Sequence, residues 1–208
     1  LEKALSGSST ALIAYSGGKD SIVAAHLARS FGVRSSICDV SFTFKKQRES
    51  IEQIAHILDI DVVYKAHLGL EWLKKNKHVL FSTSSSVRSW SFAQRQQRTV
   101  KLRAKEIGAD LQIFGRRTEE NSVPSKLYTT KAGLQCHPIR DWKESQVWEY
   151  MAKYSIPTPY IYTTELGKRE GNTGFHSVHP KRWGNSVSNC WDVVESMGDI
   201  YHRGMLDA

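Results

Sequence analysis

Blocks of apolar residues alternate with amphipathic segments along the first third of the chain. The run ALIAY at 11–15 predicts a buried strand, and the apolar positions between 20 and 31 recur at helical spacing. A second strand is expected at 35–42, a helix at 45–58 and a third strand at 61–66. Because strands alternate with helices, this pattern predicts a parallel α/β sheet.

The same alternation returns farther along the chain. A helix is predicted at 99–107, closed by Gly108, and a fourth buried strand at 110–114. The polar segment RRTEENSVPSK after Gly115 predicts an exposed loop at the carboxyl end of that strand. Ligands of open α/β sheets bind at this edge, so we expect the site there.

A further helix is predicted at 141–154. Asp141 is its expected N-cap, and Glu144, three positions on, is the expected partner in a capping box. Val147, Trp148 and Met151 recur at helical spacing and form the face that we expect to be buried.

The last part of the chain is less regular. Six glycine or proline positions among residues 160–190 predict loops, followed by a helical tail near 190–201. We therefore expect one main domain over residues 1–158, with a loop-rich C-terminal segment, 159–208, packed on it.

Composition and charge narrow the class of protein. No apolar stretch approaches the roughly 18 residues of a membrane span, and the first residues, LEKALSGSST, lack the pattern of a secretory signal. We therefore expect a cytoplasmic protein without a membrane partner. The formal net charge of +8 favours an anionic partner, which leaves open a nucleotide, a phosphorylated or sulfated small molecule and nucleic acid.

The stretch AYSGGKDSIV at 14–23 carries the strongest chemical signal. A strand that passes through glycines into a helix presents backbone N–H groups and the positive end of the helix dipole, which suits a phosphate. The fingerprints GxxxxGK[ST] and GxGxxG place their glycines at other spacings. Residues 16–21 read SGGKDS, which resembles the SGGxDS loop of the PP-loop superfamily of ATP pyrophosphatases.

The resemblance implies that this loop holds the pyrophosphate portion of ATP while the α-phosphate is attacked and pyrophosphate leaves. The residue types suit that task, because glycines allow close approach, serine hydroxyls donate hydrogen bonds and Lys19 neutralises developing charge. Asp20 can orient Lys19, cap the helix or hold Mg²⁺. The expected nucleotide-binding residues are Ser16, Gly17, Gly18, Lys19, Asp20 and Ser21, with Lys19 catalytic, Asp20 a metal ligand, and ATP and Mg²⁺ as cofactors.

Later segments resemble the branch of phosphoadenylyl-sulfate (PAPS) reductases and sulfate adenylyltransferase small subunits. The segments that match this branch are GRRTEE at 115–120, PIRDW at 138–142, VWEY at 147–150 and PTPYIY at 157–162, together with Asp39 and Phe44, and the likeness runs from about Ala11 to about Gly174. It implies an adenine nucleotide alpha hydrolase-like, Rossmann-like fold, an open, mainly parallel sheet flanked by helices. Residues 1–158 are then the nucleotide-binding domain.

The same branch implies further site residues. Asp39 and Gly115 are expected to bind the nucleotide. Arg116 and Arg117 are expected to be catalytic, because a guanidinium fork pairs bidentately with phosphate or sulfate, and Glu119 or Glu120 can orient it.

The sequence differs from those of PAPS reductases at the position of their reactive cysteine. These enzymes attack sulfur with a thiolate in an ECG-like motif of the C-terminal segment, where this sequence reads HRGMLDA. Cys38, Cys136 and Cys190 form no CxxC pair, so we expect no disulfide scaffold, no iron–sulfur cluster and no thiol-based reduction. Cys190 is expected to be buried.

The segment before Cys190 is rich in basic groups. His176 and His179 have HxxH spacing, but they provide two ligands where a structural zinc needs four. We interpret the surrounding residues as a basic lid over the nucleotide or the second substrate: Lys168, Arg169, His176, Lys181 and Arg182.

Our first hypothesis is therefore an enzyme that cleaves ATP between its α and β phosphates and adenylates a substrate. One alternative is a PAPS reductase or sulfotransferase-like protein that uses an external thiol. Another is a non-catalytic module that binds nucleotides or nucleic acid, the latter through the basic, aromatic-bearing stretch at 87–105. A homodimer or a partner subunit that completes the site is compatible with each.

Overall fold

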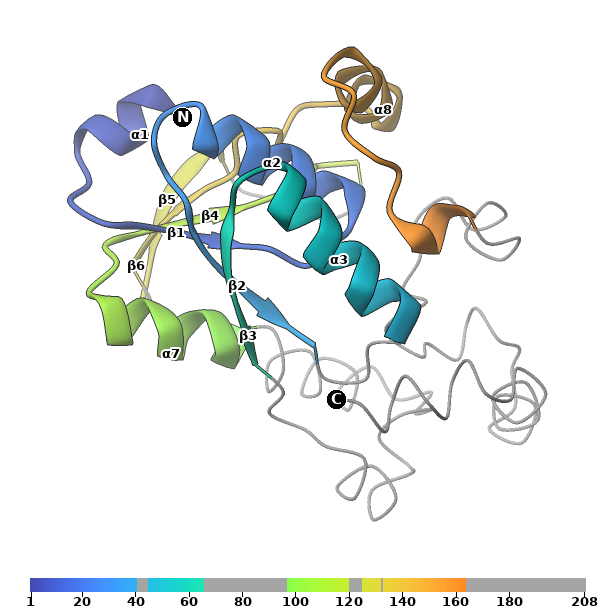
Figure 1. Cartoon of the computed structure of the whole chain (residues 1–208). Coiled ribbons are helices and arrows are strands. Elements are labelled where there is room, and N and C mark those ends of the chain that lie inside the picture. Colours follow the sequence, from blue (N-terminus) through green and yellow to red (C-terminus); the bar gives the residue numbers. More distant parts are fainter. Residues whose placement is uncertain (41–44, 66–96, 120–124, 132, 164–208) are drawn as a thin grey trace, which may run out of the picture. The chain divides into compact units, whose positions relative to one another are not determined.

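The computed structural model describes residues 1–40, 45–65, 97–119, 125–131 and 133–163 (Figure 1). The chain divides into two compact units. The first comprises Leu1–Cys38, Ile51–Tyr64 and Thr99–Pro159, and the second Asp39–Ser50, Lys65–Arg98 and Tyr160–Ala208. Most of the second unit lies outside the described residues, so the division expected at residue 158 stays a prediction.

Six strands form one sheet in the order β3-β2-β1-β4-β6-β5. β1 lies between β2 and β4 and is parallel to both, β4 is parallel to β6, and β5 at the edge is antiparallel. The strands are β1 (Ala11–Ala14), β2 (Ser35–Asp39), β3 (Asp61–Lys65), β4 (Leu111–Phe114), β5 (Leu127–Thr130) and β6 (Gly133–Cys136). The expected open, mainly parallel α/β sheet is thereby confirmed.

The helices predicted at 20–31, 45–58 and 99–107 are present to within a few residues, whereas the short helix at the start of the chain was not predicted. The helices are α1 (Glu2–Ser6), α2 (Lys19–Arg29), α3 (Lys45–Ile57), α7 (Arg98–Ile107) and α8 (Glu144–Lys153), followed by a 3-10 turn, η2 (Tyr160–Thr163). α2 and α7 lie on opposite faces of the sheet (Figure 1). Among the helices of the described ranges, none combines the length and the apolar character that crossing a membrane requires.

The prediction for the start of α8 was wrong. The helix begins at Glu144, and the residue before it, Lys143, donates its backbone N–H to Gln146 Oε1 at 2.8 Å. Asp141 does not cap the helix, because its carboxylate pairs with Lys126 Nζ at 3.0 Å and with Arg140. Two cations thus hold the expected capping side chain in the turn that precedes α8.

Strands β5 and β6 were not predicted. Each has four residues, and residues 127–130 alternate between exposed and half-buried positions without an apolar run. β6 joins the sheet through its register with β4, in which Leu111 pairs with Leu134 and Ile113 with Cys136. Pairing with a strand distant in sequence, rather than local periodicity, therefore specifies this edge.

The sheet buries both of its faces. On the α7 side, Leu12 and Ile37 pack against Val100 and Ala104. On the other side, α2 contacts β1 and β4, and its residues Ile22 and Val23 are fully buried. Burial on both faces accounts for the apolar runs that identify these parallel strands in the sequence.

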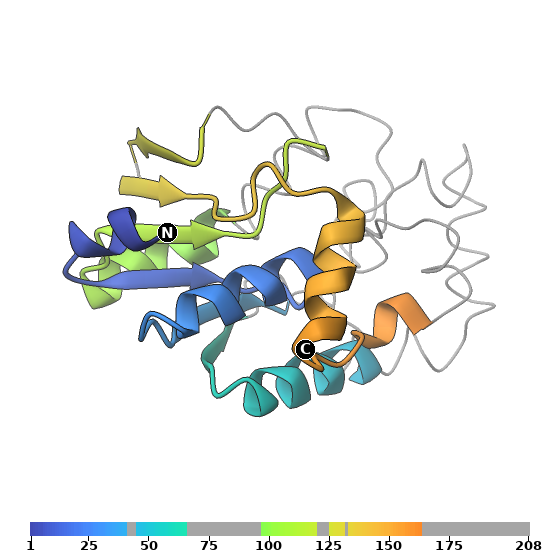
Figure 2. The ribbon, with the colours of Figure 1, turned by 90° about the horizontal axis from the view of Figure 1, so that it is seen from above.

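α8 packs beside the beginning of α2 (Figure 2). His26 Nδ1 lies 2.8 Å from the Tyr150 hydroxyl, and the rings of Tyr150 and Tyr154 are 4.5 Å apart between centroids. Val147 and Met151 are buried as predicted. This packing places the first turn of α8 close to the first turn of α2.

Gly115 follows β4 and allows a close approach to α2. A Cβ at this position would lie 2.3 Å from the backbone oxygen of Asp20 and 2.6 Å from the backbone nitrogen of Ser21. These neighbouring atoms belong to the backbone, so they cannot rotate out of the way as a side chain can. The absence of a side chain at Gly115 therefore lets the end of β4 contact the first turn of α2.

His137 is a buried histidine whose two ring nitrogens have no hydrogen-bond partner. It follows β6, and its ring stacks between Phe114 and Tyr128, with centroid distances of 5.5 and 5.4 Å. Burial, with smaller contributions from Arg116 and Arg140, lowers its pKa to about 4. The folded protein therefore holds His137 neutral.

We predict that Gly115→Ala lowers the free energy of unfolding by about 2 kcal/mol or more, because the new methyl group overlaps backbone atoms of α2. Urea denaturation measures this loss. Gly7→Ala is the matched control, since Gly7 has a φ of −100° and nothing within 4 Å of its Cβ position. Equal stability of the two variants would contradict the close contact.

We predict a stability loss of about 2 kcal/mol between pH 7.5 and 5 from His137 alone. In the unfolded chain the imidazole of His137 has its ordinary pKa of about 6.5 and binds a proton over this range. In the folded chain its pKa is about 4, so it stays neutral and the folded state loses stability relative to the unfolded state. His137→Phe should remove this part of the pH dependence, measured by urea denaturation at both pH values. His56→Gln, at an exposed position, should retain it; a His137→Phe profile like that of the wild type would refute the assignment.

Candidate active site

The segment from Ser16 to Ser21 joins β1 to α2, includes the first residues of that helix and is closely packed at Gly17. Gly17 has a φ of +72°, and a Cβ there would lie 2.2 Å from Ile51 Cγ1. Both conditions exclude side chains at this position. Gly18 is extended and directly precedes the helix, so the first-turn amides of α2, which have no acceptor within the helix, border the loop.

The Ser21 hydroxyl closes the loop on itself. It accepts the backbone N–H of Ser16 at 3.1 Å, lies 3.0 Å from Ser16 Oγ and donates to the Gly18 carbonyl at 2.9 Å. These bonds hold the two ends of the SGGKDS segment together before any ligand binds. Binding of phosphate by Ser16 and Ser21 stays a prediction.

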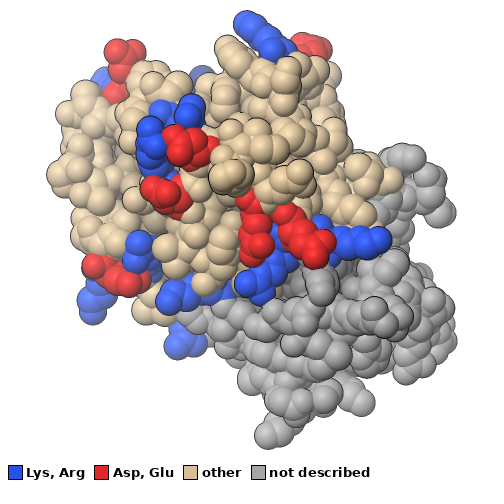
Figure 3. Space-filling model, in the orientation of Figure 1, with Lys and Arg blue, Asp and Glu red and all other residues tan. Residues whose placement is uncertain are grey.

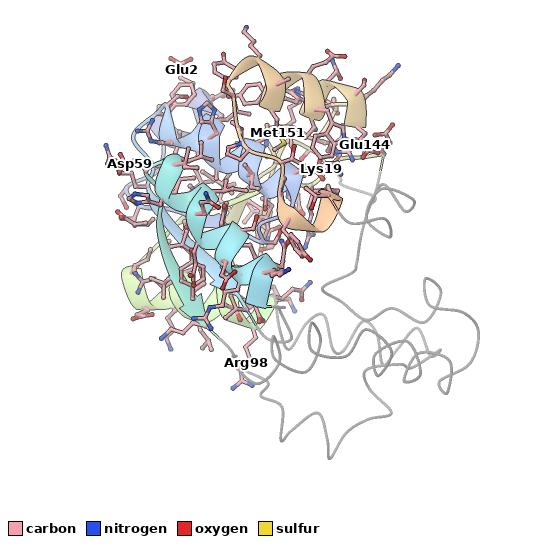
Figure 4. All side chains as sticks on the ribbon, turned by 45° about the vertical axis from the view of Figure 1, so that its right-hand side comes forward. Glu2, Lys19, Asp59, Arg98, Glu144 and Met151 are labelled. Atoms are coloured by element: carbon pink, nitrogen blue, oxygen red, sulfur yellow. The ribbon has the colours of Figure 1, made fainter. Side chains whose placement is uncertain are left out.

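Lys19 is the first residue of α2, and its side chain is fully buried. Its Nζ lies 3.0 Å from Asp20 Oδ2 and 3.5 Å from Glu144 Oε1. Figure 4 shows Lys19 at the start of α2 beside Glu144 at the start of α8. Two carboxylates from different helices therefore surround the lysine charge.

Arg117 connects the loop after β4 to the first turn of α2. Its side chain is 1% exposed, its Nε lies 2.5 Å from Asp20 Oδ1, and its Nη1 donates to Glu119. Asp20 is thus bonded through one oxygen to Arg117 and through the other to Lys19. The aspartate orients both cations, which is one of the three roles predicted for it.

Glu119 connects this arrangement to α8. Its Oε2 accepts the backbone N–H of Glu144 at 2.9 Å as well as the bond from Arg117. The hydrogen bond from Arg117, and then that from the Glu144 amide, hold the pKa of Glu119 below its usual value. A carboxylate at a helix N-terminus also suits the helix dipole.

We call Lys19, Asp20, Arg117, Glu119 and Glu144 the charge cluster. All five belong to the first unit. With two cationic and three anionic side chains, these five residues carry a formal net charge of −1, and the neighbouring Lys143 is a further cation that acts on Glu119. The sequence indicated the first four, whereas Glu144 appeared only as a capping residue, because its position 125 residues from Lys19 gives no local signal.

The remaining predicted residues lie around the cluster or beyond it. The Arg116 guanidinium sits 5.2 Å from the centre of the Phe114 ring. Gly115 contacts the first turn of α2, as described above. Asp39 is the last residue of β2 and belongs to the second unit, so its part in nucleotide binding stays a prediction. Glu120 and the basic lid residues lie outside the described residues.

Asp20 alone does not provide a magnesium site. Both of its oxygens contact cations, and the described part of the chain holds no group of three or more His, Cys, Asp or Glu side chains placed to bind a metal. Magnesium needs about six oxygen ligands and is commonly held by substrate phosphates with one or two carboxylates. Magnesium binding stays a prediction.

The described cysteines are poor nucleophiles. Cys38 and Cys136 are buried, and burial raises the pKa of the Cys136 thiol. A raised pKa disfavours the reactive thiolate. Cys190, His176 and His179 lie outside the described residues.

Comparison with known proteins agrees with this geometry. Residues 10–201 match the family described as phosphoadenosine phosphosulfate reductase domain. No curated protein matches the chain. Among solved structures, PAPS reductase from Candida auris in a phosphate complex is similar in fold, with a TM-score of 0.54 and 14% sequence identity over 74% of this chain and 76% of that chain. The match over most of the sequence and the sheet topology lead to one conclusion: the chain belongs to the PAPS reductase domain family.

Proposed function

We propose that this protein binds ATP at the SGGKDS loop and cleaves the bond between the α and β phosphates, transferring the adenylyl group to an anionic acceptor. The observation that carries the proposal is the loop itself. It connects the central strand β1 to α2, is closed by Ser21 and sets a buried lysine at the helix N-terminus. A helix N-terminus, whose first-turn amides have no acceptor within the helix, together with a cation is suited to a polyphosphate.

The position of the loop in the sheet supports a ligand site. β1 lies between β2 and β4 in the sheet. The strands β2 and β3 are therefore added on one side of β1, and the later strands on the other side. In open α/β sheets, ligands bind at the carboxyl ends of the strands at such a switch point. The SGGKDS loop follows β1 at this end.

The proposed reaction needs positioning and charge stabilisation rather than a covalent nucleophile on the protein. An acceptor oxygen forms a bond to the α-phosphorus, while the bond to the bridging oxygen breaks and its electron pair leaves with pyrophosphate. We assign to the Lys19 ammonium the neutralisation of that leaving charge. Because Lys19 is buried, its interaction with phosphate is stronger than it would be in water.

Arg117 and Asp20 serve this reaction as positioning residues. Arg117 is buried and bonded to two carboxylates, and Asp20 directs one oxygen at Lys19. Arg116 is half-buried, and its guanidinium packs against the Phe114 ring. We therefore assign the positioning of Lys19 to Arg117, and for Arg116 we keep the contact with the substrate anion that the GRRTEE motif implies.

The acceptor is proposed from charge alone. The net charge of +8 favours an anion. On the face drawn in Figure 3, acidic side chains lie beside basic ones, which suits a small anionic acceptor better than a long nucleic-acid backbone. A cytoplasmic location and a completing partner subunit remain parts of the proposal.

A second candidate function is reduction or transfer of the sulfonate of PAPS with an external thiol. The match to the PAPS reductase domain favours it. The buried state of Cys38 and Cys136 requires that the thiol come from elsewhere than these two residues. The two functions differ in the bond that breaks, which makes their products distinct.

We predict that α-labelled ATP, Mg²⁺ and a suitable acceptor yield labelled AMP or an adenylated product together with pyrophosphate. Lys19→Met should lower kcat/KM about 100-fold, since it removes the charge that stabilises the leaving group. Lys101→Met, at an exposed position on α7, is the control. Labelled ADP as the product would mean that the wrong bond breaks, and thiol-dependent sulfite release from PAPS without pyrophosphate formation would favour the second candidate.

We predict that substitution of Arg117 lowers stability, whereas substitution of Arg116 weakens the binding of ATP. Arg117→Met should cost about 3 kcal/mol of stability, because it leaves Asp20 with one cation in a buried site. Arg116→Met should weaken ATP binding about tenfold, because it removes the guanidinium that we propose contacts the substrate anion. Urea denaturation and calorimetric titration with ATP measure the two effects. An Arg117→Met protein as stable as the wild type would show that the buried pair does not hold the loop.

A further inference from the structure

The charge cluster presents an electrostatic conflict with the binding of phosphate. Its net charge is −1, and Lys19, which the proposed reaction needs for pyrophosphate, already lies 3.0 Å from Asp20 Oδ2 and 3.5 Å from Glu144 Oε1. A phosphate brought to the lysine ammonium therefore approaches carboxylates of the same sign. A carboxylate that turned away would remove this repulsion and leave more of the lysine charge for the ligand.

The three carboxylates differ in how firmly they are held. Asp20 bonds to Lys19 and Arg117, and its side chain is 12% exposed. Glu119 is 51% exposed, but it accepts hydrogen bonds from Arg117 and from the Glu144 amide. The Glu144 side chain has the longest of these ion pairs, 3.5 Å, and is 38% exposed. Glu144 is the carboxylate that can turn into solvent at the lowest cost.

We propose that Glu144 competes with the polyphosphate of the nucleotide for Lys19 and thereby sets the affinity of the site. This inference rests on the proposed function. In the ligand-free chain Glu144 neutralises the buried lysine, and on binding the phosphate takes its place. The remaining four members of the cluster, two cations and two carboxylates, are then neutral among themselves.

The backbone geometry makes this exchange local. Glu119 holds the amide of Glu144 rather than its side chain, so rotation of the Glu144 side chain leaves that hydrogen bond intact. Val147 and Met151, buried on the same helix, keep α8 in place. The exchange therefore needs side-chain rotation alone and no movement of α8.

Calorimetric titration with inorganic pyrophosphate, without divalent metal, tests the proposal. Glu144→Gln keeps the size of the side chain and removes its charge, so we expect a dissociation constant three- to tenfold lower than that of the wild type. Glu149→Gln makes the same charge change at an exposed position on α8 and should alter the constant less than twofold. The gain should shrink at high salt, because screening weakens the repulsion that Glu144 exerts.

A structural role for Glu144 predicts the reverse sign, because loss of a supporting contact weakens binding. Unchanged or weaker binding of pyrophosphate by Glu144→Gln would overturn the proposal, and Glu144→Ala provides a second variant with the same expected gain. Thermal denaturation establishes that each variant is folded. Failure of the wild type and both variants to bind pyrophosphate or ATP would instead overturn the proposed function on which the inference rests.

Discussion

The buried ion pair between Arg117 and Asp20 is the interaction on which the site depends. It joins the loop after β4 to the first turn of α2, at the place where Gly115 lets the two backbones touch. An isolated buried charge is very unfavourable, so each of these side chains needs the other. The pair therefore specifies one relative position of loop and helix, and with it the direction of the Lys19 side chain.

This arrangement explains how the protein can keep a lysine buried without a ligand. Asp20 and Glu144 supply the opposite charge that Lys19 requires in the interior. The same carboxylates repel an incoming phosphate. The contacts that stabilise the buried lysine therefore also lower the affinity for the proposed nucleotide.

Much of the fold followed from local sequence patterns. Parallel strands buried on both faces appear as apolar runs, and α2, α3 and α7 show helical spacing, so each was predicted to within a few residues. β5 and β6 were missed because short, half-exposed edge strands carry no such pattern. The start of α8 was wrong because Lys126 and Arg140 hold Asp141, and Lys126 comes from the other side of the β5–β6 hairpin.

The sequence by itself determined the SGGKDS loop, because its six residues are consecutive and the glycines are required by local geometry: a positive φ at Gly17 and close packing against Ile51. It also indicated that arginines follow β4. Only the tertiary structure decided that Arg117 is buried against Asp20 while Arg116 packs on Phe114, and that Glu144 reaches Lys19. Such choices depend on distances between segments about a hundred residues apart, for which neighbouring residues carry no signal.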